Sequence, residues 1–424
     1  MLSNCQGKPQ VSLAHANVKG YDQISISKRT VEVSAMKYEI KCTKCGKISS
    51  SVLDFRCSCE SPLEVRLQFG FDKGKIHGQN CGLWRYSSFF PYVKQEEIIS
   101  LGEGWTPLVQ FSDGLYFKLD YLNPTGSFKD RGATMLISAL HNSLKKANGY
   151  ISEDSSGNAG ASVAAYAARA GLKAKIYVPK NVSGQKFNQS LFYGAEIVRV
   201  SGSRNKVTEE AMKSEDGRFY VGHVLHPLFR DGIRTLAYEL AEQFSWKLPE
   251  YIYLPVSAGT LLLGVISGLV HLKDSGVIDA VPKIIACQTR QVSPLYHRFK
   301  RLKYVPPKTV TSVADALISI KPPLLELMVK GLKKVDGDAV MVEEDEVIGA
   351  FRDLARNGFF VEPSSAVAFA AYRKQLQNRK ISRDAKTVIV LTGIGLKTSL
   401  NPEINWNRKE EKGDFKLMFQ NLGS

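Results

Sequence analysis

The sequence predicts an α/β protein made of doubly wound units, because strands and helices alternate along most of the chain. Residues 251–256 and 388–391 read as buried strands, and 174–179 reads as a strand that follows a small-residue helix. The chain has 424 residues, 44% of them hydrophobic, which suffices for two or three domains of roughly 150 residues each. We find no internal repeat, low-complexity stretch or coiled-coil heptad that would point to another class.

A turn followed directly by a helix places one lysine, Lys129, at the helix start. Pro124 and Gly126 are turn formers, Ser127 is expected to cap the helix, and residues 133–140 are rich in apolar side chains. A lysine amine whose pKa is lowered by partial burial or by a positive dipole end forms a Schiff base with an aldehyde. A lone lysine is usually solvated surface, so this prediction of a carbonyl-cofactor site depends on its neighbours.

A second polar loop, residues 155–162, opens the small-residue helix expected at 163–171. Backbone amides at such a helix start bind anions, and the Asn158 side chain can donate a hydrogen bond to a phenolate oxygen. A purely structural interpretation is equally open, in which Ser155 caps the helix and Gly157 forms a turn.

A third unit joins the strand 251–256 to a helix at 261–272 through a turn at 257–260. Hydroxyl and backbone N–H groups of this turn suit a phosphate. The segment 251–272 contains no Asp, Glu, Lys or Arg, but the break at 255–259 divides it and argues against a membrane span. The fourth unit is the strand 388–391, which delivers Thr392 at its carboxyl end, where ligands bind in open α/β sheets.

Taken together, these motifs resemble pyridoxal-phosphate enzymes of fold-type II, and most of all threonine synthases and threonine-synthase-like proteins. The matching segments follow the family order between about residues 37 and 400, and they are 102–108, 123–132, 156–158, 232–235, 362–366 and 392–397. The resemblance implies a fold-type II core over residues 71–424, with a smaller α/β domain inserted at about 134–235. It also implies a homodimer.

The resemblance assigns roles to individual residues. It implies that Lys129 is the Schiff-base lysine, that Asn158 meets the cofactor's ring oxygen and that Thr392 meets its pyridine nitrogen. A hydroxyl leaves that nitrogen mostly unprotonated, which suits elimination and replacement at the β or γ carbon. It further implies a cofactor-phosphate loop of Ser257, Ala258, Gly259, Thr260 and Leu261, and a loop for the substrate carboxylate or phosphate of Ser155, Ser156 and Gly157.

The expected reaction converts O-phosphohomoserine and water to threonine and phosphate. The substrate phosphate needs further cationic and hydroxyl partners, for which the candidates are Arg230, Arg234, Thr235 and Lys186. A solvated helix face is an equally open interpretation of Arg230 and Lys186.

Some residues depart from the family pattern. Ala258 and Thr260 stand where glycines are common, Ile394 stands where the family has histidine, and residues 313–317 look more like threonine dehydratases. A serine/threonine dehydratase, or an enzyme that uses O-phosphoserine for β-replacement, therefore stays open as an alternative.

Four cysteines in the N-terminal part, at residues 37–70, have the spacing of a small zinc ribbon. They are Cys42, Cys45, Cys57 and Cys59. Four thiolates close a tetrahedral structural zinc site, although the single residue between Cys57 and Cys59 is unusually short. A vestigial ribbon and a disulfide pair are the alternatives.

Residues 1–35 are polar and without periodicity, so we expect a flexible extension, and Met36 is a candidate for the biological start. The first residues lack the apolar run of a signal peptide, and seven cysteines do not make a disulfide scaffold, so a cytoplasmic location is expected.

The chain is strongly basic. The net charge of +16, with a basic patch at 297–303, leaves a nucleic-acid-binding protein as a minor alternative. An enzyme with an anionic cofactor and an anionic amino-acid substrate explains the charge equally well.

Overall fold

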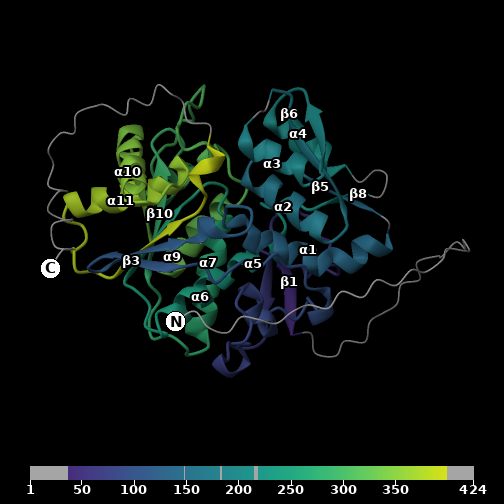
Figure 1. Ribbon diagram of the computed structural model, residues 1–424, viewed down its shortest axis with the longest axis horizontal. Coiled ribbons are helices and arrows are strands. Elements are labelled where there is room, and N and C mark those ends of the chain that lie inside the picture. The colour runs from purple at the N-terminus through teal and green to yellow at the C-terminus, as the bar shows by residue number, and fades with distance from the viewer. Residues whose placement is uncertain (1–36, 148, 182–183, 214–217, 399–424) are drawn as a thin grey trace, which may run out of the picture.

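The computed structural model describes residues 37–147, 149–181, 184–213 and 218–398. Within these ranges the strands form a two-stranded, a four-stranded and a six-stranded sheet. Figure 1 shows the four-stranded sheet and its helices on the right, and the six-stranded sheet on the left. The expected extension at 1–35 and the suggested start at Met36 lie outside the described residues.

The six-stranded sheet has the order β11-β10-β9-β12-β4-β3, in which β3 is antiparallel to β4 and all other neighbours are parallel. Its strands are β3 (Leu108–Ser112), β4 (Leu115–Leu119), β9 (Tyr251–Pro255), β10 (Lys283–Thr289), β11 (Asp338–Val342) and β12 (Thr387–Leu391).

Helices cover both faces of this sheet. Ile252 and Leu254 of β9 share a core cluster with α7 (Thr260–Asp274), whereas Tyr253 shares one with α11 (Pro363–Gln377). Successive strand residues therefore bury opposite faces. This arrangement confirms the predicted doubly wound α/β class.

The four-stranded sheet is parallel throughout and has the order β7-β6-β5-β8. Its strands are β5 (Tyr150–Glu153), β6 (Lys173–Pro179), β7 (Glu196–Val200) and β8 (Arg218–Tyr220), and its helices are α2 (Asn158–Arg169), α3 (Gln185–Phe192) and α4 (Arg204–Met212). Helix α1 (Lys129–Lys146) packs against α2 and against α5 (Pro227–Ile233). The sheet lies within the range 134–235 expected for the smaller domain, whose boundaries stay a prediction.

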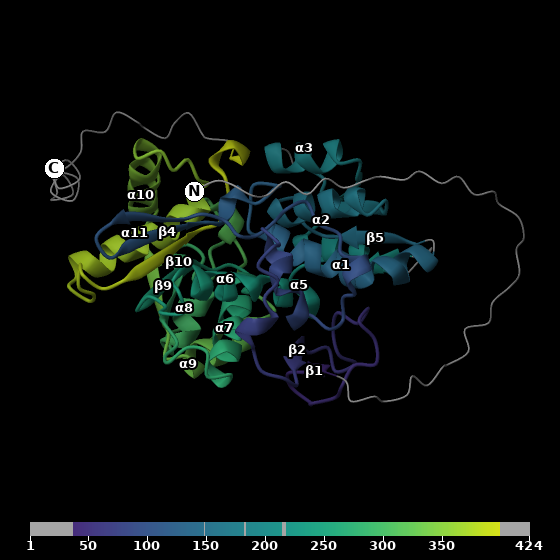
Figure 2. The same cartoon turned by 60° about the horizontal axis from the view of Figure 1, so that its bottom comes forward.

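The two-stranded sheet pairs β1 (Tyr38–Cys42) with β2 (Leu63–Leu67) in antiparallel register. Figure 2 shows this sheet at the bottom of the molecule, below α5, and β2 contacts α5. The guanidinium of Arg230 in α5 donates to the backbone carbonyl of Leu63, which joins the N-terminal segment to the core.

The remaining elements complete the layers and connections. They are the α-helices α6 (Thr235–Gln243), α8 (Pro294–Phe299), α9 (Leu325–Lys334) and α10 (Glu344–Arg356) and the 3₁₀ turns η1 (Lys73–Lys75), η2 (Leu83–Phe89), η3 (Gln95–Glu97), η4 (Asp120–Leu122), η5 (Asp315–Leu317) and η6 (Gly395–Lys397). None of the described helices has both the length and the apolar character needed to cross a bilayer.

Two local predictions differ from the structure. Ser127 does not cap α1, which begins at Lys129 behind Phe128 without a side-chain cap, because Ser127 instead bridges to Gly393 through its backbone. Helix α2 begins at Asn158 and not near residue 163. This earlier start is possible because Gly160 lets the helix approach Ser155, where an added Cβ would lie 1.9 Å from the carbonyl oxygen.

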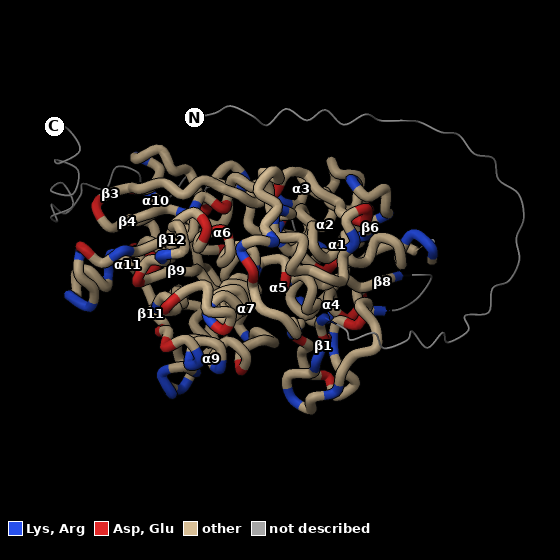
Figure 3. The backbone as a smooth tube through the Cα atoms, turned by 90° about the horizontal axis from the view of Figure 1, so that it is seen from below, with Lys and Arg blue, Asp and Glu red and all other residues tan. Residues whose placement is uncertain are grey.

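The basic residues are dispersed over the fold. Figure 3 shows Lys and Arg spread over many elements and interspersed with acidic residues. In the patch at 297–303, Arg298 pairs with Glu326 at 2.8 Å and Lys300 with Asp338 at 2.5 Å. Two cations of this patch are thus already neutralised by acids of the same chain, which weakens the case for a phosphate-tracking surface.

Candidate active site

Three segments that are distant in sequence meet beside the start of α1. The Phe128 N–H donates to the Thr392 carbonyl at 3.0 Å, and the Ile394 N–H donates to the Gly126 carbonyl at 3.0 Å. The Glu362 N–H in turn donates to the Gly393 carbonyl at 2.9 Å. Gly126 has φ +81°, and a Cβ there would lie 2.7 Å from Ile394 Cγ2, so glycine is required. These contacts fix the lysine motif against the end of β12.

Lys129 is the first residue of α1 and is half-buried. Its Nζ donates to Thr260 Oγ1 at 3.4 Å and lies 4.7 Å from the Phe128 ring centroid and 5.9 Å from that of Phe229. Burial lowers the pKa of Lys129 to about 8, although the carboxylates of Glu153 and Glu362 oppose the shift. The neutral amine, which is the form that attacks a carbonyl, is therefore more abundant near neutral pH than in an ordinary lysine.

The turn between β9 and α7 faces Lys129 through Thr260. Gly259 has φ +101°, and a Cβ there would lie 2.5 Å from Met328 Sδ, so both the backbone and the packing require glycine. The first amides of α7 have no partner within their own helix, so this turn is suited to bind an anion. Ser257 and Ala258 are half-buried, and Thr260 and Leu261 are buried.

Asn158, at the start of α2, belongs to a buried polar network. Its Nδ2 donates to Glu362 Oε1 at 2.8 Å, and its Oδ1 accepts from Lys397 Nζ at 3.0 Å. Lys186 Nζ lies 2.7 Å from Glu362 Oε2 and 3.1 Å from Asp315 Oδ2. The network thus connects both sheets through α2, α3 and α11.

The two lysines of this network differ in charge state. Burial opposes the charge of Lys186, but Glu362 and Asp315 outweigh it and raise the pKa of this lysine. Burial lowers the pKa of Lys397 to about 8, and the nearby Lys186 charge adds to this effect while Asp130 and Glu362 oppose it. One ammonium is therefore held firmly charged beside another that gains or loses its proton readily.

The loop 155–157 lies beside this network. The Gly157 N–H donates to Ser155 Oγ at 3.2 Å, and a Cβ on Gly157 would lie 3.9 Å from Lys186 Cδ. Ser155, Ser156 and Gly157 are all half-buried. Hydroxyls, the start of α2 and a charged lysine thus converge on one place, which suits a carboxylate or a phosphate.

Thr392 is held by the start of α11. Its Oγ1 lies 2.9 Å from Ser365 Oγ, which also accepts from the Thr392 and Gly393 N–H groups at 2.9 Å each. Nearby, Ser127 Oγ is buried and has no hydrogen-bond partner among the described residues. The site therefore offers a reactive amine, an anion-binding turn and spare hydroxyls, a set that fits a carbonyl cofactor carrying a phosphate.

The four residues predicted to bind the substrate phosphate fall into two groups. Lys186 lies in the Asn158 network, whereas Arg230 donates to backbone carbonyls, among them that of Val224 at 2.9 Å. Arg234 pairs with Asp231, and Thr235 Oγ1 donates to the Gly232 carbonyl at 2.7 Å. The structure thus gives Arg230, Arg234 and Thr235 partners within the protein, and their contact with substrate stays a prediction.

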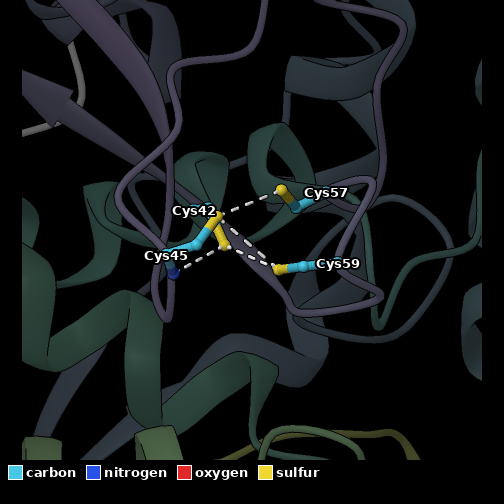
Figure 4. Close-up of side chains that lie close together, drawn as sticks. All are labelled: Cys42, Cys45, Cys57 and Cys59. Carbon is cyan, nitrogen blue, oxygen red and sulfur yellow. Dashed lines mark hydrogen bonds between the residues drawn. The ribbon is translucent and has the colours of Figure 1, made fainter.

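The four N-terminal cysteines converge as their spacing predicts (Figure 4). The Cys42 and Cys59 sulfurs are 3.5 Å apart, and Cys45 lies 3.6 Å from both Cys57 and Cys59. All four are free thiols, and their sulfurs lie within 4.8 Å of one another. Tetrahedral Zn²⁺ with bonds of about 2.3 Å requires sulfurs about 3.8 Å apart, so the set fits a structural zinc ion.

Sequence reasoning assigned no role to several residues that the structure brings to the site. Three of them, Glu362, Ser365 and Lys397, lie in segments that carry the family resemblance. The resemblance therefore pointed to these segments, but it did not say which residues they would contact. Glu153 and His223 offered a weaker signal, an acid at the end of a buried strand and a histidine after Gly222.

The comparisons with known proteins agree with this geometry. Residues 99–393 match the family model described as pyridoxal-phosphate dependent enzyme. The chain is 31% identical to "Threonine synthase" of Methanocaldococcus jannaschii over 84% of this chain and 92% of that protein, and 28% identical to "Threonine synthase" of Methanosarcina acetivorans over 85% and 92%. The fold resembles the processed form of threonine deaminase isoform 2 from Solanum lycopersicum, with a TM-score of 0.60, 21% identity and coverage of 77% of this chain and 86% of that one.

Proposed function

Because the chain belongs to the pyridoxal-phosphate-dependent enzymes, and within them to the threonine-synthase-like family, we propose that it converts O-phosphohomoserine and water to threonine and phosphate. It is a lyase whose cofactor is pyridoxal 5'-phosphate. The observation that carries the substrate proposal is the pair of buried lysines, Lys186 and Lys397, beside the loop 155–157. The turn 257–261 would serve the cofactor phosphate, so a substrate phosphate needs other cations. The candidates are Lys186, which Glu362 and Asp315 hold in place, and Lys397, which donates to Asn158.

The cofactor, when bound, supplies an electron sink for charge that develops on the substrate's α carbon. Lys129 would hold the cofactor and would serve as base at the α proton, a role that its lowered pKa favours. Asn158, held by Glu362 and Lys397 at the start of α2, would offer its amide to the cofactor's ring oxygen. The Thr392 hydroxyl, which Ser365 orients, would meet the pyridine nitrogen.

The substrate's two anionic groups need different partners. We assign its carboxylate to Ser155, Ser156 and the N–H groups at the start of α2, and its phosphate to Lys186 and Lys397. Lys186 keeps its charge because Glu362 and Asp315 flank it. A phosphate dianion would hold Lys397, whose pKa is lowered to about 8, in its charged form, because a new negative charge raises a lysine's pKa.

The direct test is to incubate the purified, pyridoxal-phosphate-loaded protein with O-phosphohomoserine, O-phosphoserine, threonine and serine in parallel. We expect phosphate and threonine in equal amounts from O-phosphohomoserine. If keto acid forms from threonine or serine and no phosphate is released from either phosphorylated substrate, the protein is instead a dehydratase. This is the alternative favoured by Ile394 and residues 313–317. Phosphate from O-phosphoserine alone would assign a β-replacement enzyme.

Three further assignments accompany this proposal. The cysteine cluster holds one structural Zn²⁺ per chain, a prediction that metal analysis of the purified protein tests. The homodimer and the cytoplasmic location expected from the sequence stay predictions, testable by light scattering and by fractionation of the source cells.

A further inference from the structure

A buried acid and a histidine form a pair at the edge of the four-stranded sheet, next to Lys129. His223 Nδ1 lies 2.7 Å from Glu153 Oε1, and the His223 N–H donates to Glu153 Oε2 at 3.0 Å. Both carboxylate oxygens are therefore occupied by the same residue, which fixes the ring orientation. An acid that holds Nδ1 leaves Nε2 as the working nitrogen of an imidazole.

The topology places this pair on the active-site edge of the sheet. Glu153 is the last residue of β5, and His223 follows β8, which is the parallel neighbour of β5. The loop 155–157 and the start of α2 continue from the same edge. Gly222 makes the approach possible, because a Cβ there would lie 2.0 Å from the Tyr220 side chain. Carboxyl ends of adjacent parallel strands are where open α/β sheets bind ligands.

The histidine and the cofactor lysine flank one aromatic ring. The His223 ring centroid lies 5.7 Å from that of Phe229, and Lys129 Nζ lies 5.9 Å from the same Phe229 centroid. The Glu153 side chain is fully buried, whereas that of His223 keeps 12% of its surface exposed. Within the described part of the chain, Nε2 of His223 has no hydrogen-bond partner. This nitrogen is thus left available at the site.

A metal ion is a poorer occupant of this cluster, although Glu153, Asp154 and His223 lie close enough together to ligate one. Asp154 Oδ1 accepts from Tyr220 at 2.9 Å, and its Oδ2 accepts from Thr208 at 2.6 Å. Asp154 Oδ2 also pairs with Arg204 at 2.9 Å. Each carboxylate oxygen in the cluster thus already faces an N–H or O–H donor, so the arrangement serves hydrogen bonding.

Both members of the pair favour their neutral forms. Burial, followed by the charge of Asp154, raises the pKa of Glu153 well above its usual value. Burial, followed by the charge of Lys129, lowers the pKa of His223 well below its usual value. The charged and titratable groups around the pair are Asp154, Tyr220, Arg204 and Lys129. A proton shared between Oε1 and Nδ1 is the state consistent with these shifts.

The proposed reaction has a use for such a pair. Between O-phosphohomoserine and threonine, the γ carbon loses phosphate and becomes a methyl group, while the β carbon exchanges a hydrogen for hydroxyl. One proton must therefore leave the β carbon and another must reach the γ carbon, in addition to the α proton that Lys129 handles. Lys129, which would also anchor the cofactor, is poorly placed to transfer protons at the α, β and γ carbons alike.

We propose that His223, held by Glu153, is a second proton-transfer group of this site and delivers the proton to the carbon that loses phosphate. The β proton leaves earlier with the phosphate, as hydrogen phosphate. The Nε2–H bond then breaks towards the γ carbon while the Glu153 proton moves to Nδ1, so the ring stays neutral and Glu153 becomes a carboxylate. The reverse transfer, in which Nε2 takes up the proton released by the water that adds at the β carbon, restores the pair. Glu153 is the positioning residue. The inference rests on the proposed function.

The test compares His223→Asn and Glu153→Gln with Tyr220→Phe, a control that alters the same cluster without touching His223. We expect His223→Asn to lower kcat for phosphate release about 100-fold, at the low end of proton-transfer contributions, with KM within about threefold. Glu153→Gln should show a smaller loss, and Tyr220→Phe should stay within about twofold. Imidazole in the buffer should partly restore the rate of His223→Ala.

Two readouts separate proton delivery from general damage. Deuterium exchange at the threonine α carbon in D₂O depends on Lys129, so it should be unchanged in His223→Asn; a parallel fall would contradict the inference. In cofactor-free protein labelled with ¹⁵N-histidine, the signal lost in His223→Asn should be that of a neutral ring at pH 7. An imidazolium at that pH would overturn it.

Failure of the proposed function gives a different pattern. If the unmodified protein forms keto acid from threonine and releases no phosphate, the substrate proposal is wrong. The same variants then test the inference on hydroxide loss, because hydroxide must take up a proton to leave as water. Full turnover in His223→Asn on whichever substrate is processed would refute the role of His223.

Discussion

Two basic residues on the first turn of α1, Lys129 and Arg131, lie in opposite electrostatic surroundings. Arg131 is fully buried and donates to Asp120 at 2.6 Å and to Glu239 at 2.7 Å. Lys129 has one long hydrogen bond to a hydroxyl and two aromatic rings nearby. The same helix thus carries one cation with full compensation and, two residues earlier, one with almost none.

The compensated cluster extends beyond Arg131. Lys118 pairs with Glu239 and donates to the Thr106 carbonyl at 2.6 Å and to Gln243 at 2.8 Å. Burial alone would raise the pKa of Glu239, but Arg131 and Lys118 outweigh it and lower the pKa to about 2. Two cations and two acids with satisfied donors anchor α1 to β4 and α6, so this cluster has a structural role.

The difference teaches how one helix serves both stability and chemistry. Paired charges hold α1 in place, because removing one partner would leave another charge buried without compensation. The rigidity gained there keeps Lys129 where its own charge is disfavoured. The neutral form of this amine is therefore more accessible than in an ordinary lysine, and it is the form that a carbonyl cofactor requires.

The largest expected effect follows from removing the reactive amine. Lys129→Ala should lose activity on the order of 10⁴-fold or more, because the cofactor anchor and the base are one group. The visible absorbance of the lysine-bound cofactor should disappear as well. Phosphate release measures the activity, and an absorbance spectrum measures the bound cofactor. If the variant kept full activity, the assignment of Lys129 as the cofactor lysine would be wrong.

Although Lys129 is needed for activity, its presence should lower the stability of the fold. Its folded pKa of about 8 lies below the 10.5 of an ordinary lysine. The unfolded chain therefore binds more protons between these values, so Lys129 disfavours the fold below about pH 8, and this cost vanishes as the pH rises through 10.5. Lys129→Met should consequently melt no lower than the unmodified protein at pH 7.

Breaking the cluster of Arg131, Lys118, Asp120 and Glu239 should, in contrast, lower the stability of the fold. Glu239→Gln leaves Arg131 and Lys118 short of one negative charge, which we expect to cost about 3–5 kcal/mol of unfolding free energy. Urea titration measures this loss. If Glu239→Gln were as stable as Lys129→Met, the contrast between the two clusters would not hold.

The cysteine cluster provides a third case, in which compensation comes from a metal. We expect one zinc ion per chain, and its removal by a chelator or by Cys57→Ser should lower the melting temperature, because metal binding contributes to folding free energy. Arg230 should transmit part of this loss to α5, since it donates to the Leu63 carbonyl. An unchanged melting temperature and no bound metal would favour a vestigial ribbon.

The smallest effect concerns the substrate anion. Lys186→Gln should raise KM for O-phosphohomoserine about 10–100-fold, which corresponds to about 1.5–3 kcal/mol for a charge-assisted hydrogen bond. Arg230→Gln is the matched variant and should lower stability with little change in KM. If Lys186→Gln and Arg230→Gln raised KM equally, Arg230 would also be a substrate-binding residue.

Local patterns predicted the fold and the turns that meet at the candidate site. The buried strands at 251–255 and 387–391, the turn before Lys129 and the glycine at 259 each carry their own signal in nearby residues. Ser127 was misjudged as a cap because its backbone bridges to Gly393, far along the chain. Capping preferences describe only the residues next to a helix and contain no information on such a contact.

The partners of buried charges could not be read from the sequence. Lys186 meets Asp315 129 positions away, Arg230 meets Leu63 167 positions away and Glu153 meets His223 70 positions away. A lone basic or acidic residue on a helix or strand end looks the same whether it is solvated or paired. Only the packing of the two sheets decides which charges are compensated.

The most direct test is the pKa of Lys129 itself, measured as the pH dependence of the rate at which cofactor-free protein binds pyridoxal phosphate covalently. The account predicts a rate that rises with pH and levels off above an apparent pKa of about 8. A rate that keeps rising to about pH 10.5, as for an exposed lysine, would contradict the claim that the fold leaves this amine uncompensated.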